Sequence, residues 1–181
     1  MTDAEKEVCA GLGGRVAQAI EEVRRICMGL RPPMLDDLGV VSAIDWFCSE
    51  LRQVLLGTEV IKDVRADEDA IPQPVKIAIF RILQEACGNA CKHSRAQRLS
   101  VLLETDAEGI RLEVADNGVG FDPASVRRFC GGFGLVGMRE RAAMTDGYLS
   151  IRSQAGRGTR ILAAWRAMEP TESISPWLSV A

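Results

Sequence analysis

The sequence predicts an α+β fold, and three observations indicate it. Residues 80–94 sort into an apolar half and a polar half when they are placed at about 100° per residue, which is typical of an amphipathic helix packed on a core. Residues 99–104 and 110–115 are predicted to form two strands joined by a turn. Residues 148–153 and 159–166 are predicted to form two further strands around a glycine-rich turn. Helices and strands are therefore expected in one chain.

Two helices are predicted before the central one. Residues 15–30 carry apolar side chains at helical spacing, so this helix has a stripe that needs a partner, either the rest of the domain or the same helix of a second chain. It stops before Pro32, because proline lacks the N–H group that a helix interior needs. Residues 34–39 form a short connector to a second helix at residues 40–56, and Gly57 ends that helix.

A strand and the central helix follow. Residues 58–64 alternate enough to predict a strand, and residues 66–69 form a polar turn. Pro72 and Pro74 stand in the first turn of the central helix, where a missing N–H group costs nothing. The helix continues to Ser94.

The last third of the chain is rich in glycine. Residues 116–123 form a loop at the end of a predicted strand, and the stretch from Gly132 leads into a helix that ends near Thr145. After the last two strands, residues 167–181 contain two prolines and are predicted to be a loose tail.

Composition places the chain among ordinary globular proteins. It has 181 residues, of which 47% are hydrophobic and 26% charged. A net charge of −3 with acids and bases interspersed gives no basic footprint for nucleic acid. No apolar run approaches the roughly 18 residues that span a bilayer, and the acidic start is not a signal peptide. We therefore expect a cytoplasmic chain.

The cysteines indicate a reducing compartment. None of them forms a Cys-x-x-Cys pair, so we expect buried free thiols and assign no metal to cysteine. Two of them lie on the apolar half of the central helix. The six cysteines are Cys9, Cys27, Cys48, Cys87, Cys91 and Cys130.

The polar half of the central helix has an unusual content. Glu85 and Asn89 stand four residues apart, and Lys92 and His93 lie one turn further along the same face. A base, a neutral oxygen ligand and a cation in one row suit a magnesium-bound polyphosphate. On this stretch alone, a solvated helix face explains the pattern as well.

Three glycine motifs carry further chemistry. Asp116 precedes glycines at a strand end, which exposes a carboxylate that can accept from an exocyclic amine such as that of adenine; the alternative is a plain Asp-Asn-Gly turn. The Gly132-x-Gly134-x-x-Gly137 motif offers N–H groups to phosphate at a helix start but fails the dinucleotide-binding and protein-kinase patterns. Gly156-x-Gly158 is equally compatible with a hairpin turn.

Taken together, four motifs resemble the N box and the glycine boxes of the GHKL ATPase superfamily. In chain order they are Glu85-x-x-x-Asn89-x-x-Lys92-His93, Asp116-x-Gly118-x-Gly120, Gly132-x-Gly134-Leu135-x-Gly137-Met138 and Gly156-x-Gly158-Thr159. Two further stretches resemble bacterial two-component sensor histidine kinases of the nitrate/nitrite-sensor and membrane-fluidity-sensor type. They are Leu30-Arg31-Pro32-Pro33-x-Leu35-Asp36-Asp37-Leu38-Gly39 and Gly137-Met138-Arg139-Glu140-Arg141.

The resemblance implies a fold and an activity. Residues 71–166 would form the ATP-binding core, a two-layer α/β sandwich of the Bergerat type with a mixed sheet and helices on one face. The implied activity is that of a protein-histidine kinase. It binds Mg-ATP and transfers the γ-phosphoryl group to a histidine, for relay to an aspartate of a response regulator.

The resemblance also implies a role for each motif residue. Asn89 would ligate Mg²⁺, and Glu85 would be the catalytic residue that orients or deprotonates the attacking group. Lys92 and His93 would contact phosphates, and Asp116 would accept from the adenine amine. The other expected ATP-binding residues are Gly118, Gly120, Gly132, Gly134, Leu135, Gly137 and Thr159.

One departure from the family pattern concerns the phosphoacceptor. Family members carry a histidine followed by aspartate on the helix before the one that begins here near Arg15, but the only histidine is His93, which Ser94 follows. We expect a fragment of a larger kinase, with a complete protein that has lost autophosphorylation as the other interpretation. The alternative functions are a nucleotide-gated GHKL interaction module and an anti-sigma-type serine kinase.

The expected organisation has a core and three accessory parts. Residues 1–33 would be a remnant of the dimerisation and phosphotransfer helix, 34–70 the connecting helix and first strand, 71–166 the ATP-binding core, and 167–181 the tail. The expected partners are a response-regulator receiver domain and, in the parent protein, a second copy bound through the N-terminal helix. Contact with nucleic acid or membrane is not expected of this chain, although the parent could be anchored in the inner membrane.

Overall fold

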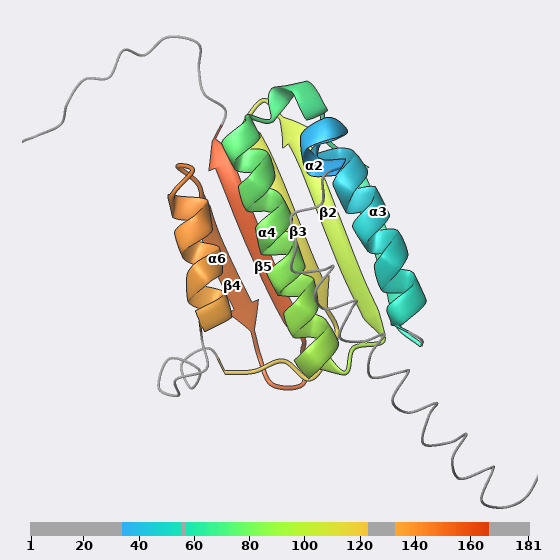
Figure 1. Ribbon diagram of the computed structural model, residues 1–181. Helices are drawn as coiled ribbons and strands as arrows, with labels where there is room; N and C mark the ends of the chain where they lie inside the picture. The colour runs from blue at the N-terminus through green and yellow to red at the C-terminus, as the bar shows by residue number, and fades with distance from the viewer. Residues whose placement is uncertain (1–33, 56, 123–132, 167–181) are drawn as a thin grey trace, which may run out of the picture.

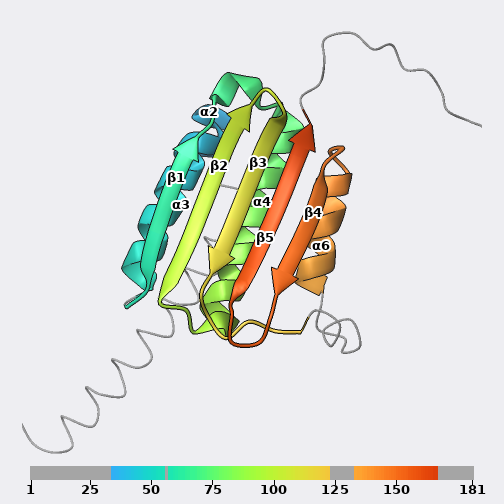
Figure 2. The same cartoon turned by 180° about the vertical axis from the view of Figure 1, so that it is seen from behind.

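The described part of the chain forms two layers, a five-stranded sheet with helices on one of its faces (Figures 1 and 2). The computed structural model describes residues 34–55, 57–122 and 133–166. The expected helix at residues 15–30, the tail from residue 167, and Gly132 lie outside the described residues. The predicted two-layer sandwich is confirmed.

The sheet is mixed. Its strands stand in the order β1-β2-β3-β5-β4, with β1 parallel to β2 and every other neighbouring pair antiparallel. All of the strands predicted from the sequence are present to within one or two residues. In chain order the described elements are α2 (Met34–Asp37), α3 (Gly39–Val54), β1 (Glu59–Arg65), η1 (Glu68–Ala70), α4 (Gln73–Asn89), η2 (Ala90–Ser94), β2 (Arg98–Asp106), β3 (Gly109–Asp116), α6 (Phe133–Ala143), β4 (Tyr148–Ser153) and β5 (Thr159–Arg166).

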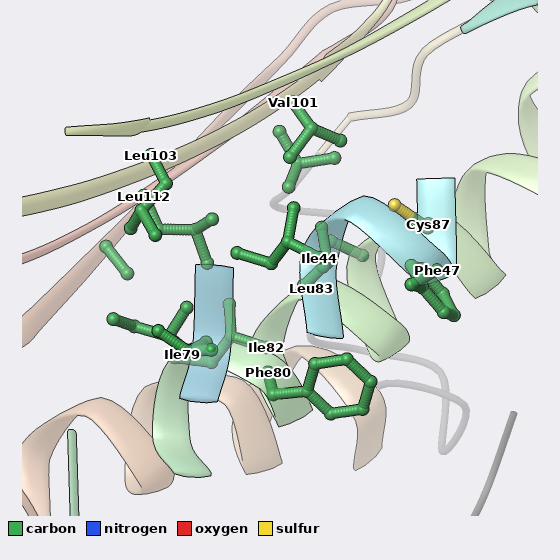
Figure 3. Close-up of a cluster of buried hydrophobic side chains, with 14 of the residues drawn as sticks. Ile44, Phe47, Ile79, Phe80, Ile82, Leu83, Cys87, Val101, Leu103 and Leu112 are labelled. Atoms are coloured by element: carbon green, nitrogen blue, oxygen red, sulfur yellow. The ribbon is translucent and has the colours of Figure 1, made fainter. Parts of the chain in front are cut away.

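The core lies between the helices and alternate residues of the strands. Leu99, Val101 and Leu103 of β2 are buried, whereas the residues between them are partly exposed on the other face. On the helix side, Phe47 of α3 and Phe80 of α4 meet edge to face with ring centroids 5.8 Å apart (Figure 3). Each side chain buried in this way stabilises the fold by about 1.5–3 kcal/mol.

Two expectations were wrong in detail. The connector at residues 34–39 contains a helical turn, α2, because Leu35 is buried in the core and anchors it. Cys91 is exposed, although it was expected to be a buried thiol. The last turn of the central helix, η2, is a π-helix, so the regular spacing on which that expectation rests does not hold there.

The other cysteines of the described residues agree with the prediction. Cys48 and Cys87 are buried and free. Burial raises the pKa of the Cys48 thiol to about 11, which keeps it protonated and inert. Among the described residues, no helix combines the length and apolar character needed to cross a membrane.

The N-terminus of α3 is capped from a distance by Glu68. Its carboxylate accepts from the N–H groups of Val40 at 3.0 Å and Val41 at 2.8 Å, and it pairs with Lys76 at 2.6 Å. Gly39 leaves room for this contact, because any Cβ there would overlap the carboxylate. Glu68 therefore joins α3, η1 and α4.

We expect Glu68→Gln to lower the free energy of unfolding by about 1–2 kcal/mol at pH 7. Burial raises the pKa of Glu68, but the hydrogen bonds from Lys76, Val41 and Val40 outweigh it and lower the pKa overall. Its contribution is therefore present at neutral pH and is lost as the pH falls through the lowered pKa of the folded state.

Urea unfolding at pH 7 and at acidic pH measures this difference. Glu108→Gln is the control, because Glu108 is exposed at the β2–β3 turn and its change should alter stability by less than about 0.5 kcal/mol. An equal loss for Glu68→Gln at both pH values would contradict the charged cap.

Candidate functional site

A cavity of about 360 Å³ lies between α4, the ends of β3 and β5, and the first turn of α6. Polar side chains from α4 stand on one side of it and the end of β3 on the other. Its lining residues are Glu85, Ala86, Asn89, Ala90, His93, Ser94, Val114, Asp116, Gly120, Phe121, Gly134, Leu135, Thr159 and Ile161.

The α4 side of the cavity carries the predicted polar row. Asn89 donates its amide Nδ2–H to Glu85 Oε1 at 3.2 Å, because residues four apart on a helix are neighbours. This bond directs the amide oxygen of Asn89 away from Glu85. His93 lines the same cavity, while Lys92 is exposed and is not among the lining residues.

The first turn of α6 approaches α4 closely at Gly134. A Cβ at this position would overlap the Glu85 carboxylate, so glycine permits the contact. Leu135 lines the cavity beside it. Gly137 is not a lining residue; a Cβ there would lie 3.1 Å from Nη1 of Arg141. The third motif is thus split between cavity and helix interior, and Gly132 lies outside the described residues.

Asp116 is fixed at the end of β3. Its Oδ1 accepts from the N–H of Gly118 at 2.8 Å, and the Thr159 N–H also donates to the carboxylate. Burial raises the pKa of Asp116, and the two backbone hydrogen bonds offset only part of that rise. A half-buried carboxylate with a raised pKa in a cavity is a candidate for ligand binding.

Two tight backbone contacts hold Asp116 in place. Val119 donates to the carbonyl of Ser94 at 2.7 Å, and any Cβ on Gly118 would overlap that serine. Gly120 has φ +58° and lies against the β4–β5 turn, where a Cβ would overlap the Gln154 carbonyl. Both glycines are therefore needed for close approach; Gly120 lines the cavity, whereas Gly118 is not among its lining residues.

Thr159 belongs to the same network. Its hydroxyl lies 3.0 Å from Ser153 Oγ, and that oxygen also accepts from the Phe121 N–H at 2.9 Å. Ser153 Oγ donates in turn to the Gly158 carbonyl at 3.0 Å. One serine of β4 thereby ties together the loop after β3 and the β4–β5 turn.

Sequence reasoning missed the apolar part of the cavity. Ala86, Val114 and Ile161 line the cavity and are also members of the buried core, so their pattern in the sequence is that of core residues. A weak signal existed in the spacing, because Ala86 and Ala90 lie one helical turn apart beside Asn89. The missed lining residues are Ala86, Ala90, Ser94, Val114, Phe121 and Ile161.

Comparison with known proteins identifies the family. The profile of the family described as "Histidine kinase-, DNA gyrase B-, and HSP90-like ATPase" matches residues 75–167, more than half of the chain. The chain belongs to this ATPase family. The match covers α4 except its first two residues, the strands β2 to β5 and every residue of the cavity, so the cavity is located in the family's ATPase domain.

Two curated relatives of this ATPase domain are similar over most of the chain. One is the signal transduction histidine-protein kinase/phosphatase DegS of Brevibacillus brevis, with 35% identity over 88% of this chain. The other is the sensor histidine kinase MctS of Rhizobium johnstonii, with 37% identity over 80% of this chain. The chain spans only 40% and 31% of their lengths. Neither name favours the alternative of a serine kinase or an interaction module.

A solved structure supports the fold of this family member. The histidine kinase domain of the blue-light activated histidine kinase from Erythrobacter litoralis EL346 superposes with a TM-score of 0.58. The two are 17% identical, and the match covers 71% of this chain and 61% of that chain. At this identity the likeness concerns the fold alone.

Proposed function

We propose that this chain is the catalytic portion of a sensor histidine kinase, binding Mg-ATP in the 360 Å³ cavity and passing the γ-phosphoryl group to a histidine outside these 181 residues. The observation that carries the proposal is the Asp116 carboxylate, fixed by the Gly118 and Thr159 N–H groups at one end of that cavity. The names of both curated relatives support the histidine kinase assignment.

The adenine end of the nucleotide would lie at Asp116. A carboxylate accepts hydrogen bonds and donates none, which matches the exocyclic amine of adenine. Val114 and Ile161 supply apolar walls beside it, and Ala86 and Ala90 leave room for a flat ring on the α4 side. These features favour an adenine nucleotide over a purely anionic ligand.

The phosphate end would lie at Glu85 and Asn89, where the donors fit magnesium. Hard oxygen ligands suit Mg²⁺, and the Asn89–Glu85 hydrogen bond leaves the amide oxygen of Asn89 able to serve as one. Among the described residues, no cluster of three acidic, histidine or cysteine side chains could hold a metal by itself. A magnesium ion here would therefore need nucleotide phosphates to complete its shell, and it would neutralise their charge.

Glu85 is the residue we assign to the reaction. It lies at the same end of the cavity as Asn89 and within reach of the first turn of α6. In this position it would orient or deprotonate the attacking histidine. Lys92 and His93 would contact phosphates, together with the loop of Gly132, Gly134, Leu135 and Gly137. The acceptor would be supplied by another segment, since His93 is the only histidine of the sequence.

The partners follow from the relay. The parent would pass the phosphoryl group to the receiver domain of a response regulator in the cytoplasm, and would dimerise through the helix predicted from the sequence at residues 15–30. The resemblance of residues 30–39 and 137–141 supports a parent of the nitrate/nitrite-sensor or membrane-fluidity-sensor type. In the structure, Leu35 of the first stretch is buried and Gly39 adopts φ +83°, so this stretch also has a structural role.

Calorimetric titration of ADP, with and without magnesium, tests the site. We expect ADP to bind with micromolar affinity and magnesium to increase that affinity. We expect Asn89→Ala to reduce the increase that magnesium gives by at least about tenfold. Gln84→Ala is the matched control, since it removes an amide from the same helix outside the cavity lining. Magnesium dependence that persists in Asn89→Ala would contradict the assigned ligand.

Phosphoryl transfer needs a separate assay. This chain is mixed with γ-labelled ATP and the full-length parent whose own site carries Asp116→Asn. Acid-labile label on the parent's histidine supports the kinase assignment. Intact nucleotide binding without any label would instead support the interaction module.

A further inference from the structure

A second cavity, of about 390 Å³, lies at the β4–β5 turn and is rich in arginine. Arg152 of β4, Arg157 of the turn and Arg160 of β5 line it, and the turn itself lies beside the end of β3. In both strands the residues next to these arginines, Ile151 and Ile161, pack toward the core. Arg152 and Arg160 therefore belong to the face of the sheet that no helix covers (Figure 2), and Arg157 lies in the turn that joins their strands.

The positive charges in this cavity are poorly compensated. Arg152 and Arg160 stand directly opposite each other in the β4–β5 register, an arrangement of like charges that destabilises a sheet. Arg160 reaches Glu113 at 3.3 Å. Within the described residues, Arg152 and Arg157 have neither a hydrogen bond nor an ion pair through their side chains.

Two other arginines on the same face have ion pairs. Arg98 pairs with Glu59 and Arg111 with Glu104, each across neighbouring strands. Arg166, at the other end of β5, also has no ion pair within the described residues, so the second cavity is distinguished by having unpaired arginines gathered beside a hollow. A missing counter-charge next to a cavity points to a ligand that supplies one.

The turn that carries Arg157 is held rigidly. The Arg157 N–H donates to the Gln154 carbonyl at 2.9 Å, and the Gly156 N–H donates to the Val119 carbonyl at 2.7 Å. Gly158 has φ +74° and is buried against the Asp116 carbonyl, which leaves no room for a side chain there. Arg157 therefore projects from a fixed backbone, so little backbone entropy is lost when it binds a ligand.

We propose that Arg152, Arg157 and Arg160 bind a phosphate group in this second cavity, which adjoins the nucleotide cavity and shares Asp116 and Thr159 with it. Guanidinium groups match phosphate oxygens in bidentate geometry, and the two arginines without partners supply charge that no acid on the sheet neutralises. Among the described residues, Asp116 is the one acidic lining residue, and its Oδ1 accepts from the Gly118 N–H; Glu113 is engaged with Arg160. The phosphate belongs either to a soluble ion or metabolite, or to the headgroup of an anionic lipid.

Titration of inorganic phosphate, followed by NMR of the backbone amides at constant ionic strength, tests the site. We expect saturable chemical-shift changes at residues 152–160. We expect the phosphate affinity obtained from them to fall about tenfold or more in Arg152→Gln/Arg157→Gln. The control is Arg98→Gln/Arg111→Gln, which removes the same charge from the same face but from paired positions. Thermal melts of both variants check that each one folds. The absence of saturable shifts in the unmutated chain, or an equal loss of phosphate affinity in the control, would overturn the proposal.

Sedimentation with vesicles distinguishes the two sources of phosphate. Binding to phosphatidylglycerol but not phosphatidylcholine vesicles, lost in Arg152→Gln/Arg157→Gln and kept in the control, assigns the site to a lipid headgroup. Phosphate binding without vesicle binding assigns it to a soluble ligand. Neither readout requires nucleotide, so failure here leaves the proposed kinase function standing, and failure of nucleotide binding leaves this site standing.

Discussion

Asp116→Asn is expected to weaken ADP binding by roughly ten- to a hundredfold while leaving the fold as stable as before or more stable. The affinity falls because a charge-assisted hydrogen bond to the exocyclic amine is worth about 1.5–3 kcal/mol. The stability does not fall, because burial raises the pKa of Asp116 and so disfavours its ionised form in the folded chain. Loss of function and gain of stability together would mark Asp116 as a binding residue.

The direction of the stability change follows from the linkage between protonation of Asp116 and folding. A group whose pKa is raised on folding stabilises the fold below its unfolded pKa and loses that contribution as the pH rises through the folded pKa. At pH 7 the ionised Asp116 therefore costs stability, and asparagine removes that cost. The nucleotide affinity of the unmutated chain should accordingly decrease as the pH falls from neutral through the raised pKa of Asp116. The reason is that protonated Asp116 no longer accepts hydrogen bonds as a carboxylate.

Calorimetry for affinity and thermal melts for stability make the test. The matched control is Asp106→Asn, because Asp106 ends β2, outside the cavity lining, and its Oδ1 accepts from the Glu108 and Gly109 N–H groups. This control should keep full affinity. Unchanged ADP affinity in Asp116→Asn, or a lower Tm with affinity intact, would contradict the assigned role.

Gly120→Ala is expected to have the largest effect on the site as a whole. Gly120 has φ +58°, and alanine there would also overlap the carbonyl oxygen of Gln154. The strained backbone costs about 1–2 kcal/mol, and the overlap with rigid backbone adds about 1–3 kcal/mol. The loop after Asp116 must then move away from the β4–β5 turn, and nucleotide binding should be lost with it.

Gly156→Ala separates the two causes. Gly156 has φ +77°, yet a Cβ there would meet nothing within 4 Å. It should therefore cost only the backbone strain, about 1–2 kcal/mol, and keep nucleotide affinity. Urea unfolding and ADP titration of both variants give the comparison. Equal losses in the two variants would show that the close packing of the loop against the turn is unimportant.

Much of the fold was predictable because it depends on local patterns. Alternation of apolar residues located β1, strand runs bounded by turns located β2 to β5, and helical periodicity located α3 and α4. Prediction failed at η2, where a π-helical turn replaces regular spacing and leaves Cys91 exposed. It also missed α2, since burial of Leu35 depends on contacts with distant parts of the chain.

The candidate site was predictable only in part. The polar row of α4 and the Asp116 strand end were recognisable, because charged residues near glycines stand out from the pattern of a core. The apolar lining was not, since Val114 and Ile161 follow the same alternation as fully packed strand residues. The arginine cavity was also hidden, because Arg152 and Arg160 become neighbours only through the pairing of β4 with β5.

By itself the sequence determined the long helices, the strands and many of the residues that carry chemistry, because periodicity and residue type are local properties. The tertiary structure decided which of those residues meet. Glu85 and Gly134 are distant in sequence but touch because α6 packs on α4. Glu68 caps α3 because the chain returns to it after β1. Such contacts depend on the packing of the whole chain, which no single stretch encodes.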